Sequence, residues 1–362
     1  MGHSERIEII KKIEALRGSH VICYLTSIRP NAGGNMGDDA VRAFFEHLSL
    51  LPERPVDSLD IFICSNGGNG VVPWRLISLF REFAKKIGVL VPYRAYSAAT
   101  MLALGADEIV MHPFAEMGPI DPTVSNEYNP IDQNTMQRIG ISVEDVKAYI
   151  SFIRDTVGIR HEDELIKAVE ILAQKVHPLA LGNVERFIAQ SRMIARKILL
   201  THMNEETHKH KIDDTIDTLA SKLYFHGHPI NRREARDELG LKVVDAPPEL
   251  ETLMWDLYKD FEEELKNTEI FDPMGEIYRQ VPDPEPFDPT AAIAVPIVPV
   301  GAFARSDDKL AIVESGRLSS SFRRTLRFVV VGTGQQGEPL IRSETLTQAW
   351  DHLPAPARAP EA

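Results

Sequence analysis

The first third of the chain alternates short apolar runs with amphipathic stretches, and this alternation restricts the fold more than any other feature. Residues that favour extended structure gather in His20–Ile28, Asp60–Cys64, Gly88–Tyr96 and Glu108–His112. Apolar residues at helical spacing occupy the intervals, over Asp38–Leu51, Pro73–Ile87 and Ala98–Gly105. Strands that alternate with helices are typical of an α/β fold with mostly parallel strands. The sequence therefore predicts an α/β core.

The middle of the chain has a helical pattern, whereas the end has a β-like one. Helices are predicted over Ser142–Asp155, His161–Lys175, Leu181–His202, Ile212–Lys222, Asn231–Leu239 and Pro248–Lys266. A proline-rich stretch follows, and β-like runs joined by polar turns come after it. We therefore predict one large domain over residues 1–272, a linker or arm over 273–290, a small β-rich segment over 291–350 and a tail over 351–362.

Composition and charge argue against several classes of protein. Apolar residues make up 43% of the 362 residues, which is enough for a sizeable core. The net charge of −13 argues against general nucleic-acid binding, because phosphate recognition needs a basic surface. Neither a transmembrane run of about 18 apolar residues nor a signal-peptide pattern is visible, so we expect a cytoplasmic protein. Cys23 and Cys64 lie in apolar β-like runs and are expected to be buried structural thiols.

A glycine-rich segment, Cys64-Ser-Asn-Gly-Gly-Asn-Gly70, joins a buried strand to a helix. Glycine at such a junction lets the backbone turn sharply and brings its N–H groups close to a ligand. Any tight turn between a strand and a helix also uses glycine, so this segment alone leaves both readings open.

Ser97 lies at a second junction of a strand with a helix, between Tyr96 and an apolar helix that begins around Ala98. Serine is a favoured helix N-cap, which is one interpretation. The other is a nucleophile at the positive end of a helix, where the Ala98 N–H faces the oxyanion of an acyl-transfer reaction. This segment taken alone favours the cap.

Taken together, the two segments resemble the catalytic core of the Clp protease/crotonase superfamily. They are most similar to its signal-peptide-peptidase-like branch, and within it to the serine dehydrogenase proteinase family. In that branch a strand followed by a Gly-Gly loop precedes the nucleophile by about thirty residues, and here Ser97-Ala-Ala is followed by an apolar helix ending in Ala106-Asp-Glu-Ile109. The Met117–Pro122 turn and the stretch from Gly227 to Leu241 also match in order. The resemblance covers roughly residues 15–250.

The resemblance implies a Clp/crotonase-type spiral of ββα units and a serine peptidase or other acyl-transfer hydrolase that acts on peptides or proteins without a cofactor. Carried over by position, Ser97 is the nucleophile, Gly68 and Ala98 supply the oxyanion-hole amides, and Gly67 supports that loop. Asp107 is expected to be structural. The family usually oligomerises, so we expect a homo-oligomer, with a trimer or tetramer favoured. Two alternatives stay open, namely a crotonase-like enzyme that binds an acyl thioester and a catalytically silent oligomeric scaffold.

A serine nucleophile needs a base, and this branch usually uses a lysine some forty to fifty residues beyond the serine. Lys147 is the lysine in that window, although its surroundings lack the flanking glycine common in signal peptide peptidases. His112 is a second candidate for the base, and His177 a weaker third. The run Thr201–Asp213 gathers His202, His208 and His210 with Glu205 and Glu206, but it is highly polar and lacks a known metal spacing. We interpret this run as the solvated end of a long helix and expect no metal site.

Overall fold

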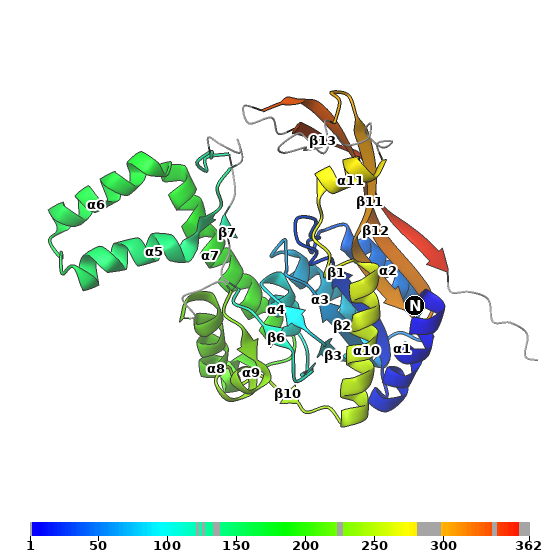
Figure 1. Ribbon diagram of the computed structural model, residues 1–362. Helices are drawn as coiled ribbons and strands as arrows, with labels where there is room; N and C mark the ends of the chain where they lie inside the picture. Colours follow the sequence, from blue (N-terminus) through cyan, green and yellow to red (C-terminus); the bar gives the residue numbers. More distant parts are fainter. Residues whose placement is uncertain are drawn as a thin grey trace, which may run out of the picture.

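The computed structural model describes residues 2–120, 123–124, 127–132, 138–222, 227–280, 298–334 and 339–354. Its centre is an eight-stranded sheet in the order β10-β5-β3-β2-β1-β11-β12-β13 (Figure 1). The bounds of these strands are β1 His20–Thr26, β2 Val56–Cys64, β3 Ala84–Val91, β5 Glu108–Met111, β10 Val243–Val244, β11 Phe303–Ser315, β12 Leu318–Thr333 and β13 Pro339–Pro354.

The sheet has a parallel half and an antiparallel half. Strands β10, β5, β3, β2 and β1 are parallel to their neighbours, and their near-continuous apolar sequences suit strands that are covered on both faces. Strand β1 then pairs antiparallel with β11, so that Ile22 lies opposite Ser315. Strands β11, β12 and β13 continue the sheet as an antiparallel meander. The β-rich end of the chain is therefore part of the central sheet.

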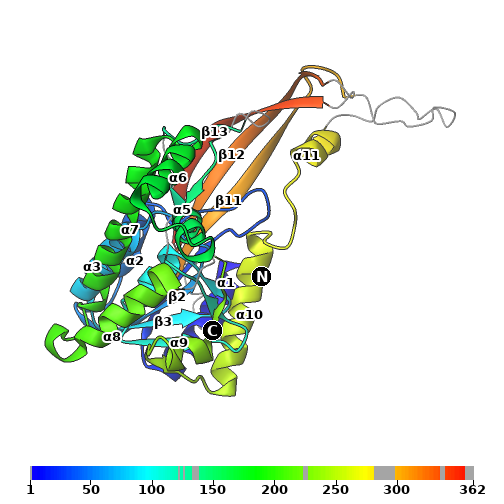
Figure 2. The ribbon, with the colours of Figure 1, turned by 90° about the vertical axis from the view of Figure 1, so that its left-hand side faces the viewer.

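Helices cover both faces of the sheet (Figure 2). One face packs against α2 Ala40–Ser49, α3 Val72–Phe83, α4 Ala98–Ala103, α7 Pro178–Leu199, α8 Glu205–Asp217 and the π-helical turn η2 Thr218–Lys222. The other face packs against α1 His3–Arg17 and α10 Pro248–Glu264. The α/β architecture predicted from the alternating pattern is confirmed.

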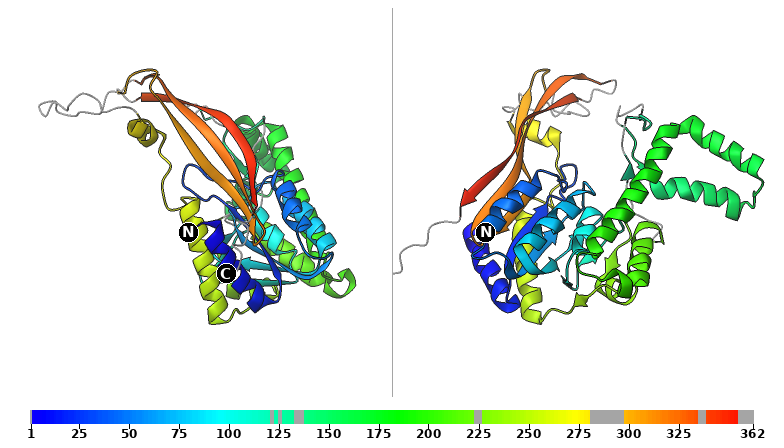
Figure 3. Two further views of the ribbon diagram at one scale, coloured as in Figure 1. Left: turned by 90° about the vertical axis from the view of Figure 1, so that its right-hand side faces the viewer. Right: turned by 180° about the vertical axis from the view of Figure 1, so that it is seen from behind.

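Smaller elements surround this core. A three-stranded sheet joins β4 Arg94–Ala95, β6 Glu116–Met117 and β9 Ile230–Asn231, and β7 Thr123–Val124 pairs with β8 Ile141–Ser142. The remaining helical elements are α5 Val143–Ser151, η1 Phe152–Thr156, α6 Glu162–Lys175, α9 Arg232–Asp237 and α11 Pro273–Gln280. Helices α5 and α6 form an arm that projects from the body beyond α7 (Figures 1 and 3).

Three predicted element boundaries are wrong. The helix predicted over Pro73–Ile87 ends at Phe83, because Ala84–Lys86 pair with β2, and Ala84 and Ile87 fit both a helical and a strand period. The predicted linker begins with α11, while residues 281–290 lie outside the described part of the chain. The histidine-rich run begins a helix rather than ending one, because the Asn204 side chain accepts hydrogen bonds from the first N–H groups of α8.

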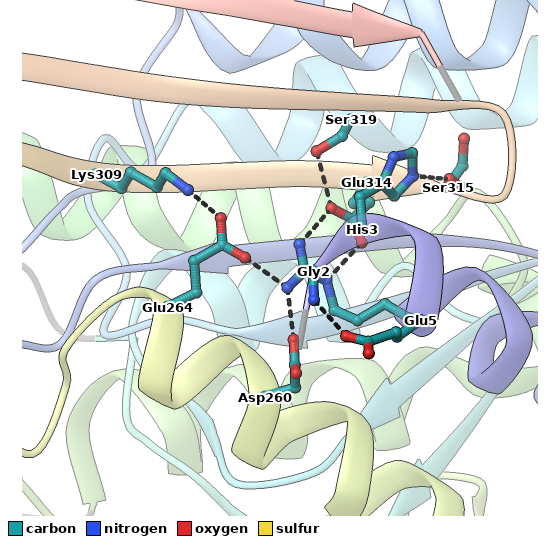
Figure 4. Close-up of polar contacts among 10 residues, drawn as sticks. Gly2, His3, Glu5, Asp260, Glu264, Lys309, Glu314, Ser315 and Ser319 are labelled. Atoms are coloured by element: carbon teal, nitrogen blue, oxygen red, sulfur yellow. Dashed lines mark hydrogen bonds and ion pairs between the residues drawn. The ribbon is translucent and has the colours of Figure 1, made fainter. Parts of the chain in front are cut away.

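A buried group of charges ties the two ends of the chain together (Figure 4). The Arg6 side chain on α1 donates to both carboxylate oxygens of Glu314 on β11, at 2.7 and 2.8 Å. It also donates to Asp260 on α10 at 2.5 Å and is paired with Glu264, which in turn contacts Lys309. We call Arg6, Asp260, Glu264, Lys309 and Glu314 the Arg6 cluster. It joins α1 and α10 to the antiparallel half of the sheet.

Candidate active site

The glycine-rich loop is held by hydrogen bonds from two directions. The buried Ser65 hydroxyl accepts from the Gly67 N–H at 3.0 Å and from the Thr26 hydroxyl at 2.8 Å. On the other side, the Met36 N–H donates to Gly67 O at 2.8 Å, and the Asn69 N–H donates to Met36 O at 2.9 Å. These bonds fix the loop before any ligand arrives.

The Gly68 N–H, between these bonded groups, has no acceptor among the described residues. Gly68 has a φ of +155°, and a Cβ built there would lie 2.5 Å from Met36 O. The position therefore requires glycine, both for its backbone conformation and for the close approach of Met36. The loop therefore holds the Gly68 N–H in a fixed position as a free hydrogen-bond donor.

Ser97 adopts a backbone conformation that a residue with a side chain rarely takes, with φ +53° and ψ −115°. Such a conformation costs on the order of 1–3 kcal/mol and persists where surrounding structure enforces it. Ser97 precedes α4, whose residues are all buried, as the sequence predicts. Its hydroxyl makes no hydrogen bond with the described residues, so it does not act as a side-chain N-cap. The Ser97 hydroxyl is thus held at the start of a buried helix without a capping role.

The Ala98 N–H is the second unused donor. The neighbouring amides are bonded, since Ala99 N–H donates to Tyr96 O at 2.9 Å and Met101 N–H donates to Ser97 O at 3.0 Å. No acceptor for the Ala98 N–H lies among the described residues. A Cβ built on Gly67 would lie 2.8 Å from the Ser97 Cβ and 2.9 Å from the Ala98 nitrogen. The glycine loop and the start of α4 are therefore in direct contact.

The Thr100 side chain holds α4 in place through hydrogen bonds to its neighbours. Its hydroxyl contacts Ala95 O at 2.6 Å and Gly118 O at 2.8 Å, and it accepts from the Gly118 N–H at 3.2 Å. These bonds join the helix after Ser97 to the strand before it and to the turn that begins at Met117. Asp121 and Pro122 of that predicted turn lie outside the described residues.

A cavity of about 420 Å³ opens in front of Ser97. Its walls come from the loop after β1, the glycine-rich loop, α4 and α7. The residues that line it are Asn35, Asn66, Gly68, Asn69, Gly70, Val71, Ser97, Met101, Ile120, Phe187, Gln190, Ser191 and Ile194. This wall mixes apolar side chains with amides and hydroxyls, and none of these described residues is titratable. The structure thus places Ser97 and Gly68 on one cavity, but no described base beside them.

Lys147 lies in α5, and its side chain is outside the part of the chain that the structure describes. Its neighbour Val146 packs against a small apolar cluster formed by Ile141 and three α7 residues, and Phe187 packs against the same cluster. Phe187 also lines the cavity, whereas no described α5 residue does. The role of Lys147 stays a prediction.

His112 lies on the other face of the sheet. Its ring stacks on Trp255 of α10 with centroids 5.3 Å apart, and its Nδ1 accepts from the Phe114 N–H. Burial lowers the pKa of His112. The cavity beside Ser97 is lined by α4 and α7, so the structure does not bring His112 to it. His177 caps α7 by accepting from the Leu179 N–H and stacks on Tyr128.

Asp107 and His202, which were also noted in the sequence, have structural partners. Asp107 pairs with Arg81 at 2.7 Å and accepts from the Ile87 N–H. His202 contacts Leu104 O at 2.8 Å. In the described part of the chain, no three His, Cys, Asp or Glu side chains are grouped so as to hold a metal ion.

The two cysteines are free and buried, and burial raises the pKa of the Cys64 thiol to about 12. Both thiols are therefore structural, as predicted from their apolar surroundings. Among the described helices, none is both long and apolar enough to cross a membrane.

Sequence reasoning missed the polar wall of the cavity. Asn66 and Asn69 flank the glycine pair, and their place in the loop was the available signal. Gln190 and Ser191 come from the middle of α7, and no local pattern marks them as part of a site. The Ser191 hydroxyl donates to Ile120 O at 2.7 Å, which ties α7 to the chain that follows β6.

Comparison with known proteins points to one family. Residues 2–155 match the family described as ClpP-like SDH-type serine proteinases. This match confirms the resemblance seen in the sequence, and the matched region contains the glycine loop, Ser97 and α4. With the order of strands and helices in the sheet, it supports a Clp-type α/β fold.

Similarities to individual proteins are low in identity and differ in how much of the chain they cover. Two uncharacterised proteins of Methanocaldococcus jannaschii are 25% and 26% identical over 183 and 261 residues. The alignments cover 46% and 70% of this chain and 62% and 78% of theirs, so the chain spans less than two thirds of the first relative. Among solved structures, a mutant of the 1510-N membrane-bound stomatin-specific protease is 13% identical, with 68% of this chain and 85% of that chain covered and a TM-score of 0.35.

Proposed function

We propose that this protein is a serine peptidase in which Ser97 is the nucleophile and the N–H groups of Gly68 and Ala98 form the oxyanion hole. One observation carries the proposal: a strained serine with an unbonded hydroxyl lies beside two backbone amides that have no acceptor among the described residues. The match to ClpP-like serine proteinases over residues 2–155 supports it.

The reaction follows from these positions. Ser97 Oγ attacks the carbonyl carbon of a peptide bond in the cavity, and its proton passes to a base. The carbonyl oxygen becomes an oxyanion, to which the Gly68 and Ala98 amides donate. Collapse of this intermediate breaks the C–N bond, the amine leaves with the proton from the base, and water then hydrolyses the ester on Ser97. Fixed amide donors need no reorganisation as the charge develops, which is why a loop held by Ser65 and Met36 suits this role.

The base is the part of the mechanism that the cavity wall does not supply. We propose Lys147, because it is the lysine at the expected separation from Ser97 and its helix packs against α7, which also lines the cavity. A lysine accepts a proton only when it is partly neutral, so Lys147 must be desolvated when it acts. We therefore expect Lys147 to lie at the cavity when it acts.

Labelling with a fluorophosphonate probe tests the nucleophile. We expect stoichiometric labelling of the wild type, mapped by mass spectrometry to Ser97, and none in Ser97→Ala. Ser58→Ala, which removes a partly exposed hydroxyl on β2, is the matched control and should label normally. Labelling of Ser97→Ala at the wild-type level would overturn the proposal. An acyl-thioester enzyme that uses the two amides alone would keep its activity in Ser97→Ala, and a silent scaffold would label in neither form.

A further inference from the structure

The last strand of the central sheet has an open edge. β13 pairs with β12 on one side, and no described residue pairs with its other side. It also exposes large apolar side chains, with Leu340 47%, Leu346 39% and Leu353 60% exposed. An edge strand presents a row of unpaired N–H and C=O groups that is a template for pairing with another strand. Figure 2 shows β13 at the margin of the long meander.

A β-bulge in the middle of β13 determines which residues share a face of the sheet. Thr347 lies opposite Thr325 and Thr345 lies opposite Leu326, so Leu346 is the extra residue. Because of this insertion, the alternation of side chains changes parity at Leu346. Trp350, which packs on Phe322, therefore shares a face with odd-numbered residues before the bulge, such as Ser343.

We propose that β13 pairs with β13 of a second copy of this chain, antiparallel and about a two-fold axis beside Leu346 and Thr347. In this register Leu340 lies opposite Leu353 of the second copy, and Arg342 lies opposite Asp351 of the second copy. The central sheet then continues from one copy into the other.

The change of parity at the bulge allows this register and those that differ from it by an even number of residues, and it excludes the rest. Opposite residues in an antiparallel pair must point to the same face of the sheet. Arg342 and Asp351 lie on one face, and Ser343 and Trp350 lie on the other, so each residue meets a partner of its own face. Moving the register by one residue would place Arg342 opposite Trp350, on different faces, and would fail along the whole strand.

Among the registers that parity allows, the charged and apolar side chains of β13 favour this one. Arg342 is exposed and makes no ion pair with the described residues, and Asp351 is exposed and lies 3.2 Å from Arg323. Pairing places Arg342 of each copy across from Asp351 of the other, and the two-fold axis makes this contact occur twice. It also brings Leu340 and Leu353 together at both ends of the strand. A second copy is thus the occupant that this edge fits.

Disulfide trapping tests the register. In the double variant Arg342→Cys/Asp351→Cys, we expect mild oxidation to give a covalent dimer on a non-reducing gel. The two positions are nine residues apart on one extended strand, roughly 30 Å, so they cannot be joined within one chain. The single variants Arg342→Cys and Asp351→Cys are matched controls and should remain uncrosslinked. Equal crosslinking in the single and double variants would overturn the register.

Light scattering and a charge exchange test the association itself. The wild type should show a mass of two chains or a multiple of two at micromolar concentration. Arg342→Asp places like charges opposite each other twice and should weaken association by about tenfold, and Arg342→Asp/Asp351→Arg should restore it. A monomer or a trimer for the wild type, or no change in Arg342→Asp, would overturn the proposal. The alternative is that the bulge protects the edge of β13 from pairing with any strand, and in that case the wild type should be a monomer.

Discussion

The cavity at Ser97 and the Arg6 cluster are both polar regions inside the fold, but polar groups are left free in the first and paired in the second. The cavity wall holds no described charge, and two amides and a hydroxyl at Gly68, Ala98 and Ser97 have no partner among the described residues. In the Arg6 cluster, the guanidinium donates to carboxylates on two other elements, and a lysine contacts one of them. Donors left free in the cavity are available to water, a ligand or a transition state, whereas the paired charges hold elements together.

The difference predicts that changes in the cavity act on turnover and changes in the cluster act on stability. Substitutions at Ser97, Lys147 or Gly67 should reduce activity more than they reduce the free energy of unfolding. Substitutions in the Arg6 cluster should do the reverse. The predictions below test this separation, beginning with the largest effect.

Replacing the proposed base should have the largest effect. Lys147→Ala should remove turnover nearly as fully as Ser97→Ala, because nucleophile and base act as a unit. Lys167→Ala is the matched control, since Lys167 is an exposed lysine on α6 that pairs with the exposed Glu164 one turn earlier. Steady-state hydrolysis of a peptide library and thermal unfolding should be measured on all three. Near-normal turnover in Lys147→Ala would remove Lys147 from the mechanism.

Adding one methyl group at Gly67 should come next. The new Cβ would lie 2.6 Å from Tyr96 O and 2.9 Å from the Ala98 nitrogen, so the loop or the start of α4 must move. Loss of one oxyanion donor costs on the order of 10²–10³ in turnover, and we expect a decrease of at least about a hundredfold. Gly182→Ala on α7 is the control, because a Cβ there meets nothing within 4 Å. A Gly67→Ala enzyme with wild-type turnover and an intact fold would exclude this loop from the site.

The central residues of the candidate site could be predicted from the sequence, whereas those of the Arg6 cluster could not. Ser97, Gly68 and Ala98 lie next to local signals, because strand ends and glycine turns are encoded by adjacent residues. Arg6 and Glu314 are 308 positions apart, and no local pattern pairs them. The same holds for the pairing of Ile22 with Ser315, which the sequence analysis missed when it set the β-rich end apart as a small segment. Long-range pairing depends on which surfaces meet, and periodicity within one element does not contain that information.

Removing the arginine of the cluster should mainly reduce stability. Arg6→Met leaves Asp260, Glu264 and Glu314 with buried like charges, and breaking a buried pair from one side costs about 3–5 kcal/mol. Arg42→Met is the matched control, because Arg42 is 86% exposed and its pair with Glu46 within α2 is worth about 0.5 kcal/mol or less. Urea unfolding measures both. Fluorophosphonate labelling of folded Arg6→Met should persist, and loss of labelling in fully folded protein would contradict the separation of the two regions.

The smallest effect concerns acid. Burial raises the pKa of Glu264, but the charges of Arg6 and Lys309 outweigh burial and bring the pKa below its ordinary value of 4.5. A carboxyl group with a lower pKa in the folded state binds fewer protons there than in the unfolded state. Its contribution to stability is therefore complete above about pH 4.5 and is lost as pH falls through the folded pKa.

The free energy of unfolding should thus fall from pH 5 to pH 3, and part of that fall should belong to Glu264. Glu264→Gln removes the titrating group, so its unfolding free energy should depend less steeply on pH in this window, although it starts lower at pH 7. Glu8→Gln on α1 is the control, because Glu8 is an exposed carboxylate that faces Lys11 in the same helix. Urea unfolding at half-unit intervals gives the slopes. Equal slopes for wild type and Glu264→Gln would show that the Arg6 cluster does not lower the Glu264 pKa enough to affect folding.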